Sequence, residues 1–140
     1  MREFNFYVVE GKIKKCSVDY SLAQSLINNV NTRENSIAEL DTHKFSLLVF
    51  ENYYDCLREL LDAILALGGY KSYSHEASIV YLKKFDFNES IIFDLDNFRK
   101  KRNNSRYYGK SPSQDDAKEI KDFFNKIKGD LLTLIDKIKK

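Results

Sequence analysis

The stretch HKFSLLVFENYYDCLRELLDAILAL, residues 43–67, carries the apolar pattern on which the predicted fold depends. Apolar side chains recur along it at alternating steps of three and four, which is the spacing of an α-helix. They form two neighbouring stripes, made of Leu47, Phe50, Tyr54, Leu57, Leu61 and Ile64, and of Val49, Tyr53, Cys56, Leu60, Ala63 and Leu67. A helix with two apolar stripes is covered on two sides, so it is either central to a bundle or borders a second subunit.

The limits of this helix and its third face can also be read from the sequence. We expect Thr42 to cap its start and the pair Gly68–Gly69 to end it. The remaining face is charged, and its residues are Glu51, Asp55, Arg58, Glu59 and Asp62. Asp55 and Asp62 stand three residues before and four residues after Arg58, a spacing that suits helical ion pairs.

Helical periodicity continues on both sides of this central segment. It predicts four more amphipathic helices, over residues 19–40, 74–85, 89–109 and 114–139. Asp19, Ser74 and Asn88 stand at the expected N-cap positions of the first three of these. Five helices joined by short breaks predict an all-α fold, an antiparallel bundle in one domain over residues 1–140.

The N-terminal part of the chain is the least regular. Residues 1–16 predict an irregular or extended lead-in, because no single period runs through them. The helix over residues 19–40 should turn inward a stripe made of Leu22, Leu26, Val30, Ile37 and Leu40. Its asparagine-rich middle favours a kink or an exposed bulge near Asn31.

Composition narrows the class of protein. The 140 residues include 43% hydrophobic and 31% charged side chains, which is typical of a folded globular domain rather than a disordered chain. A net charge of +2 is a weak argument for nucleic acid. Cys16 and Cys56 match no metal-binding spacing, and we predict no metal or cofactor. With no apolar run of membrane-spanning length and no cleavable signal, we expect no membrane association, a cytoplasmic location and reduced thiols.

The basic run RKKRNNSRYYG, residues 99–109, closes the helix that begins at Glu89. Arg102 falls on the same helical face as Ile91, Leu95 and Phe98, although guanidinium groups are rarely buried without a partner. It is either a structural arginine, paired with Glu51, Asp55 or Asp62, or a residue that lines a functional groove. Taken alone, the basic run is best explained as a solvent-exposed helix end, where positive charges interact favourably with the negative end of the helix dipole.

Three stretches together resemble the HEPN family (higher eukaryotes and prokaryotes nucleotide-binding), particularly its small prokaryotic members. They are YYDCLRELL at 53–61, GYKSYSHEA at 69–77, and RKKRN at 99–103 followed by YYG at 107–109. The resemblance runs from about Lys44 to the C-terminus. It implies a helical bundle that forms a homodimer, without a metal or cofactor. It also implies a metal-independent ribonuclease of a toxin–antitoxin or stress system, or a noncatalytic module that binds RNA, a nucleotide or a nucleotidyltransferase antitoxin.

The resemblance also places a site at the end of the fourth long helix. The family's active pattern is an arginine, a polar residue, a few more positions and a histidine; Arg102 and Asn103 match its first half. Tyr107 stands where the histidine is expected, and a tyrosine, which ordinarily titrates near 10, is a poor general base. The catalytic candidates are therefore Arg102 and Tyr107, and the candidates for binding RNA or a nucleotide are Arg99, Asn103, Arg106 and Tyr108.

Other interpretations of these residues stay open. Tyr107 and Tyr108 are better explained as packing residues than as stacking platforms for bases. His75 is better explained as a packing or capping residue than as a catalytic one. For the whole chain, the ribonuclease-type or ribonuclease-derived module competes with a noncatalytic dimeric interaction module that binds a nucleotidyltransferase or another protein, and with a purely structural dimer whose groove is vestigial.

Overall fold

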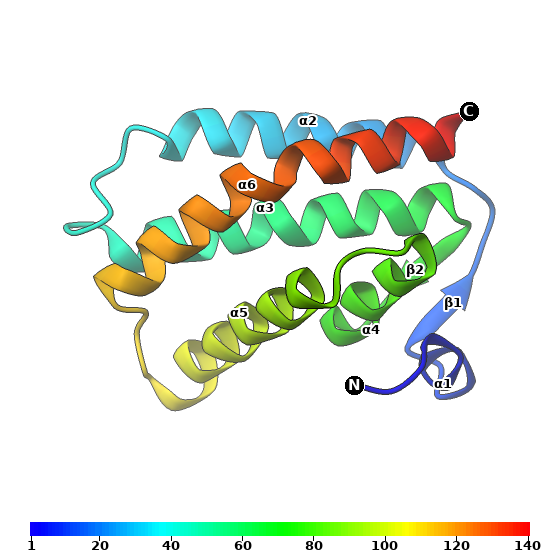
Figure 1. The fold of residues 1–140 in the computed structure, drawn as a ribbon, viewed down its shortest axis with the longest axis horizontal. Coiled ribbons are helices and arrows are strands. Elements are labelled where there is room, and N and C mark those ends of the chain that lie inside the picture. Colours follow the sequence, from blue (N-terminus) through cyan, green and yellow to red (C-terminus); the bar gives the residue numbers. More distant parts are fainter.

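A computed structural model describes residues 1–140 as a helical bundle with one small sheet (Figure 1). The elements in chain order are α1 (Phe4–Val9), β1 (Ile13–Lys15), α2 (Tyr20–Ile37), α3 (Ser46–Leu67), β2 (Tyr70–Ser72), α4 (His75–Val80), the 3-10 helix η1 (Tyr81–Phe85), α5 (Glu89–Tyr108) and α6 (Gln114–Lys139). The long helices α2, α3, α5 and α6 alternate in direction along the bundle (Figure 1). The predicted all-α class is confirmed, and no helix combines the length and the apolar composition that a transmembrane segment needs.

Helix α3 is the centre of the bundle. It packs along α2 on one side and α6 on another, with α5 and α4 on a third (Figure 1). Both predicted stripes are buried except at the first turn, where Leu47 is exposed. Tyr53 of α3 contacts Phe124 of α6, with ring centroids 5.4 Å apart. The expectation of a helix covered on two sides is confirmed within the single chain.

Most helix ends coincide with the predicted ones because side-chain caps fix them locally. The carboxylate of Asp19 accepts a hydrogen bond from the backbone N–H of Leu22, and Ser74 and Asn88 cap α4 and α5 in the same way. Gly109 ends α5 with a left-handed backbone, φ 67°. The prediction that Thr42 caps the central helix was wrong. Asp41 instead accepts hydrogen bonds from two backbone N–H groups in a turn, and α3 begins at Ser46.

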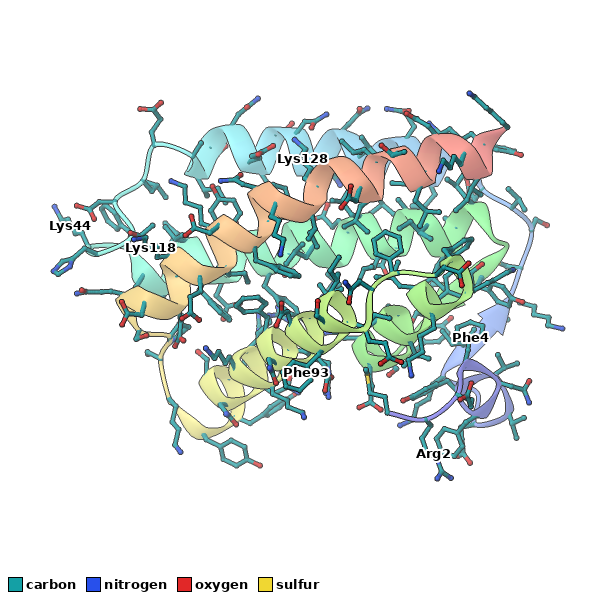
Figure 2. All side chains as sticks on the ribbon, in the orientation of Figure 1. Arg2, Phe4, Lys44, Phe93, Lys118 and Lys128 are labelled. Carbon is teal, nitrogen blue, oxygen red and sulfur yellow. The ribbon has the colours of Figure 1, made fainter.

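The lead-in over residues 1–16 is more ordered than predicted. It forms α1 and β1, and β1 pairs antiparallel with β2, with Ile13 opposite Ser72. Figure 2 shows Phe4 of α1 near the sheet; its ring lies 5.3 Å from that of Tyr70 and 4.9 Å from that of Tyr81. The extended alternative for the lead-in holds for β1, but β2 and its pairing with β1 were not predicted, because each strand has three residues and their hydrogen bonds join positions more than fifty residues apart.

Helix α2 also differs from its prediction. It is one unbroken helix from Tyr20 to Ile37, so the asparagine-rich middle does not interrupt it. Its buried residues are Ala23, Val30 and Ile37, whereas Leu22, expected in the core, is 46% exposed. At the other end of the helix, Glu34 pairs with Lys128 of α6, which is labelled in Figure 2.

Candidate functional site

Helix α5 carries Arg99, Arg102 and Arg106 on the side that faces α3 and α4. Ile92, Leu95 and Phe98 are buried and hold the helix against the core. Phe98 packs between Phe50 of α3 and Phe123 of α6, with ring centroids 6.3 and 5.2 Å away. Arg102 stands one turn after Phe98, so the same face that buries phenylalanine also buries this guanidinium.

The guanidinium of Arg102 has three partners on α3. Its Nε lies 3.2 Å from Oε2 of Glu51, and its Nη2 lies 3.3 Å from Oδ1 of Asp55. Its central carbon lies 4.8 Å from the ring centroid of Tyr54, a cation–π geometry. Only 8% of the Arg102 side chain is exposed. Of the three acids considered as structural partners, Glu51 and Asp55 pair with Arg102 and Asp62 does not.

The flanking arginines are also paired. Arg106 approaches Glu51 at 3.5 Å, but its side chain is 53% exposed. Arg99 lies 2.8 Å from Asp96 and 3.1 Å from Glu76 of α4. Burial alone would raise the pKa of Asp96, but its hydrogen bonds to Arg99 and Lys100 outweigh that effect and lower it. The basic run is therefore balanced by carboxylates along its inner side.

His75 lies at the start of α4, inside the same cluster. Its Nε2 lies 3.2 Å from a guanidinium nitrogen of Arg58, and its Nδ1 lies 3.3 Å from the hydroxyl of Tyr54. Arginine can only donate, so Nε2 accepts and Nδ1 carries the proton. Burial first, and then the charges of Arg58 and Arg102, lower the pKa of His75 to about 4. The imidazole is neutral at pH 7, with both nitrogens hydrogen-bonded, and Ser74 rather than His75 caps the helix.

Tyr107 and Tyr108 lie apart from this cluster. Their side chains are 76% and 74% exposed, so the prediction that they pack in the fold was wrong. Tyr107 follows Arg102 by five residues, which rotates it by about 140° around the helix axis. Arg102 therefore points into the protein while Tyr107 points into solvent, and one chain does not bring the two catalytic candidates together. Asn103 is half-buried next to Arg102 in sequence.

Sequence reasoning missed the contribution of α2. Arg33 donates hydrogen bonds to Glu59, at 2.6 Å from Nη2, and to Asn52, at 3.1 Å from Nη1. It also lies 3.8 Å from Asp55, so that Asp55 has Arg33 on one side and Arg102 on the other. The charged face of α3 was visible as a spacing, but no local signal pointed to an arginine on α2. The second oxygen of Glu59, Oε2, is buried without a hydrogen-bond partner.

These contacts limit the chemistry of the site. Arg102 is a buried arginine with two carboxylates, and no free histidine, cysteine or carboxylate lies beside it as an evident base. No group of three or more histidine, cysteine or acidic side chains is arranged to hold a metal ion. Comparisons with protein-family models, with curated proteins and with solved structures found no match.

Proposed function

We propose that this chain is a HEPN-like, ribonuclease-derived module that acts as a dimer through binding rather than by cleaving RNA. The observation that carries the noncatalytic part of the proposal is the state of Arg102, whose guanidinium is buried between Glu51 and Asp55 while Tyr107 faces solvent. A catalytic arginine must be able to reach a phosphate, and this one is already used inside the fold. The partners we propose are a second copy of the chain and a nucleotidyltransferase or another protein.

The relative energies favour this proposal over catalysis. Removing one partner of a buried ion pair costs ~3–5 kcal/mol, because a carboxylate is left without its counter-charge. A charge-assisted hydrogen bond to a phosphate contributes about 1.5–3 kcal/mol. Because Glu51 and Asp55 are 21% and 27% exposed, the lower end of the first range applies, and one bond to a phosphate does not exceed it; a phosphate would need further binding groups to release Arg102.

One observation favours a second candidate, a metal-independent ribonuclease. The charges of four arginines, Arg58, Arg99, Arg102 and Arg106, all act on His75, so a histidine and several phosphate-binding groups share one region. The imidazole is unprotonated, as a general base must be, but a pKa of about 4 makes it a weak base while Arg58 is in place. In this candidate RNA displaces Arg58 from Nε2 of His75 and frees that nitrogen to accept a proton.

Incubation of the purified protein with total RNA and tRNA in chelator separates the two candidates. The variants Arg102→Ala and His75→Gln are assayed beside the parent, with Lys118→Ala, which removes an exposed cation of α6 outside the cluster, as the control. We expect no cleavage by any of them. Cleavage by the parent that both Arg102→Ala and His75→Gln abolish would overturn the noncatalytic proposal and establish the ribonuclease.

The dimer is tested independently by light scattering at micromolar concentration. We expect a species of twice the 16.4-kDa chain mass. A species of one chain mass would overturn the homodimer, for which we expect an interface of the ~1,200 Å² or more that stable complexes bury.

A further inference from the structure

A cavity lies at the opposite end of α3 from Arg102. It is bounded by the first turns of α2, the last turns of α3, strand β2 and the segment that joins β1 to α2. Its volume is about 470 Å³, within the ~300–1,000 Å³ usual for small-molecule sites. Asp62 lies seven residues after Asp55 on α3, so about 10 Å of helix separates this carboxylate from the one that pairs with Arg102.

The walls of this cavity are largely apolar. Leu65 and Ala66 are buried on the α3 side, and Leu22 and Leu26 form the α2 side. Leu22 belongs to the apolar stripe of α2 and was expected in the core, yet it is 46% exposed. Its exposure has a local cause, since it borders space that no side chain of this chain fills.

One carboxylate in the cavity lacks a close partner. Asp62 receives no hydrogen bond from the protein, its one ion-pair contact is to Nε of Arg58 at 3.9 Å, and 34% of its side chain is exposed. Burial raises the pKa of Asp62 to about 6, against the lowering effect of Arg58. The other charged groups of the lining are used elsewhere. Asp19 caps α2, and the ammonium of Lys71 lies 5.6 Å from the ring of Tyr73.

We propose that this cavity binds a small organic amine, with the ammonium group on the carboxylate of Asp62 and an apolar body between Leu22 and Leu65. An ammonium complements Asp62, the carboxylate of the lining that neither caps a helix nor accepts a hydrogen bond from the protein. An ammonium donates hydrogen bonds to the carboxylate of Asp62. An apolar body of about six carbons covers Leu22 and Leu65 and so excludes water from them. The inference does not depend on the proposed function, since none of the residues that line the cavity contacts Arg102.

The probe is n-hexylammonium, with hexanol and hexanoate as neutral and anionic analogues of the same length. Binding is measured by amide chemical shifts of Leu22, Leu65 and Ala66 at pH 7. We expect saturable shifts with n-hexylammonium, about tenfold weaker binding of hexanol and no binding of hexanoate, because a charge-assisted hydrogen bond distinguishes the three. Equal affinity for all three probes, or no shifts with any of them, would overturn the proposal.

Asp62→Asn tests the carboxylate, and Asp136→Asn, an exposed acid on α6, is its matched control. The first variant should weaken n-hexylammonium binding about tenfold and the second should not change it. Cys16 supplies a second readout on the unmodified protein. It is exposed at the cavity wall, while Cys56 is buried, so Cys16 alone should react quickly with a thiol reagent. We expect n-hexylammonium to slow that reaction and hexanoate not to; equal rates would contradict the proposal.

Discussion

Replacing Arg102 with alanine removes the group that joins α5 to the charged face of α3. The variant leaves Glu51 and Asp55 without their closest shared cation and removes the contact with the Tyr54 ring. Loss of one member of a buried ion pair costs ~3–5 kcal/mol. Two features of the structure place the effect at the lower end of this range.

The first feature is solvent, since the side chains of Glu51 and Asp55 are 21% and 27% exposed and can be hydrated in part. The second is the presence of other cations, because Arg106 reaches Glu51 at 3.5 Å and Arg33 reaches Asp55 at 3.8 Å. We therefore expect Arg102→Ala to lower the free energy of unfolding by about 3 kcal/mol. For a chain of this length that corresponds to a fall in Tm of ~10 °C.

Urea unfolding followed by circular dichroism measures the loss, with Arg106→Ala as the matched control. Arg106 touches the same carboxylate from an exposed position, so its loss should cost ~0.2–1 kcal/mol. In a Glu51→Gln background, Arg102→Ala should cost less than in the parent, because part of its effect is the unpaired carboxylate. An Arg102→Ala variant within ~0.5 kcal/mol of the parent would refute the reasoning. It would mean that the guanidinium is not held by α3 and is available to a ligand, and the ribonuclease candidate would gain accordingly.

Three further predictions concern the exposed tyrosines of α5, the start of α6 and the imidazole of His75. Tyr107→Ala and Tyr108→Ala should each change the free energy of unfolding by less than ~0.5 kcal/mol in urea titrations, because both side chains are exposed; a larger loss would place them in a contact that the fold does not have. Ser113→Ala should cost ~1 kcal/mol, since Ser113 and Asp116 form a reciprocal capping box at the start of α6, and thermal unfolding measures it. The His75 imidazole should stay neutral by NMR down to about pH 5, because its pKa is lowered to about 4. Between about pH 4 and 6.5 the unfolded chain then binds a proton that the folded chain does not, so His75 destabilises the fold as the pH falls through this window, and His75→Gln should reduce the acid-induced loss; a titration midpoint near 6.5 would contradict the assignment.

The elements that could be predicted from sequence are those whose causes are local. Asp19, Ser74 and Asn88 each bond to a backbone N–H two or three residues ahead, so a short window of sequence contains the whole interaction. The range of α6 was predicted to the residue, because its apolar face is regular from Ile120 to Ile138. The strand β2 and its pairing with β1 were missed because their hydrogen bonds join residues more than fifty positions apart, and three residues show no period.

The site was predicted in part for the same reason. An arginine on an apolar helical face implies a buried partner, and the acids on the charged face of the central helix were the evident choices. Which of these acids pairs with Arg102 depends on the position of α5 along α3. That position is set by tertiary packing, and it places Arg102 beside Glu51 and Asp55 and not beside Asp62. The exposure of Tyr107 has a local cause instead, because this residue is rotated by about 140° from Arg102 around the helix axis. Periodicity shows which way a side chain points but not where the neighbouring helix ends.

Arg102 therefore links the stability of the bundle to its chemistry. Its guanidinium is shared between Glu51 and Asp55, and Asp55 is itself shared with Arg33, so one set of charges joins α2, α3 and α5. If the guanidinium of Arg102 bound RNA or a nucleotide instead, Glu51 and Asp55 would lose the cation between them and would repel each other. The end of α5 would also lose its main polar contact with α3. A ligand that bound Arg102 would thus have to stabilise α5 by its own contacts. A phosphate and the two carboxylates therefore compete for the same guanidinium, and one hydrogen bond to the phosphate does not exceed the ~3 kcal/mol that the contacts with α3 contribute.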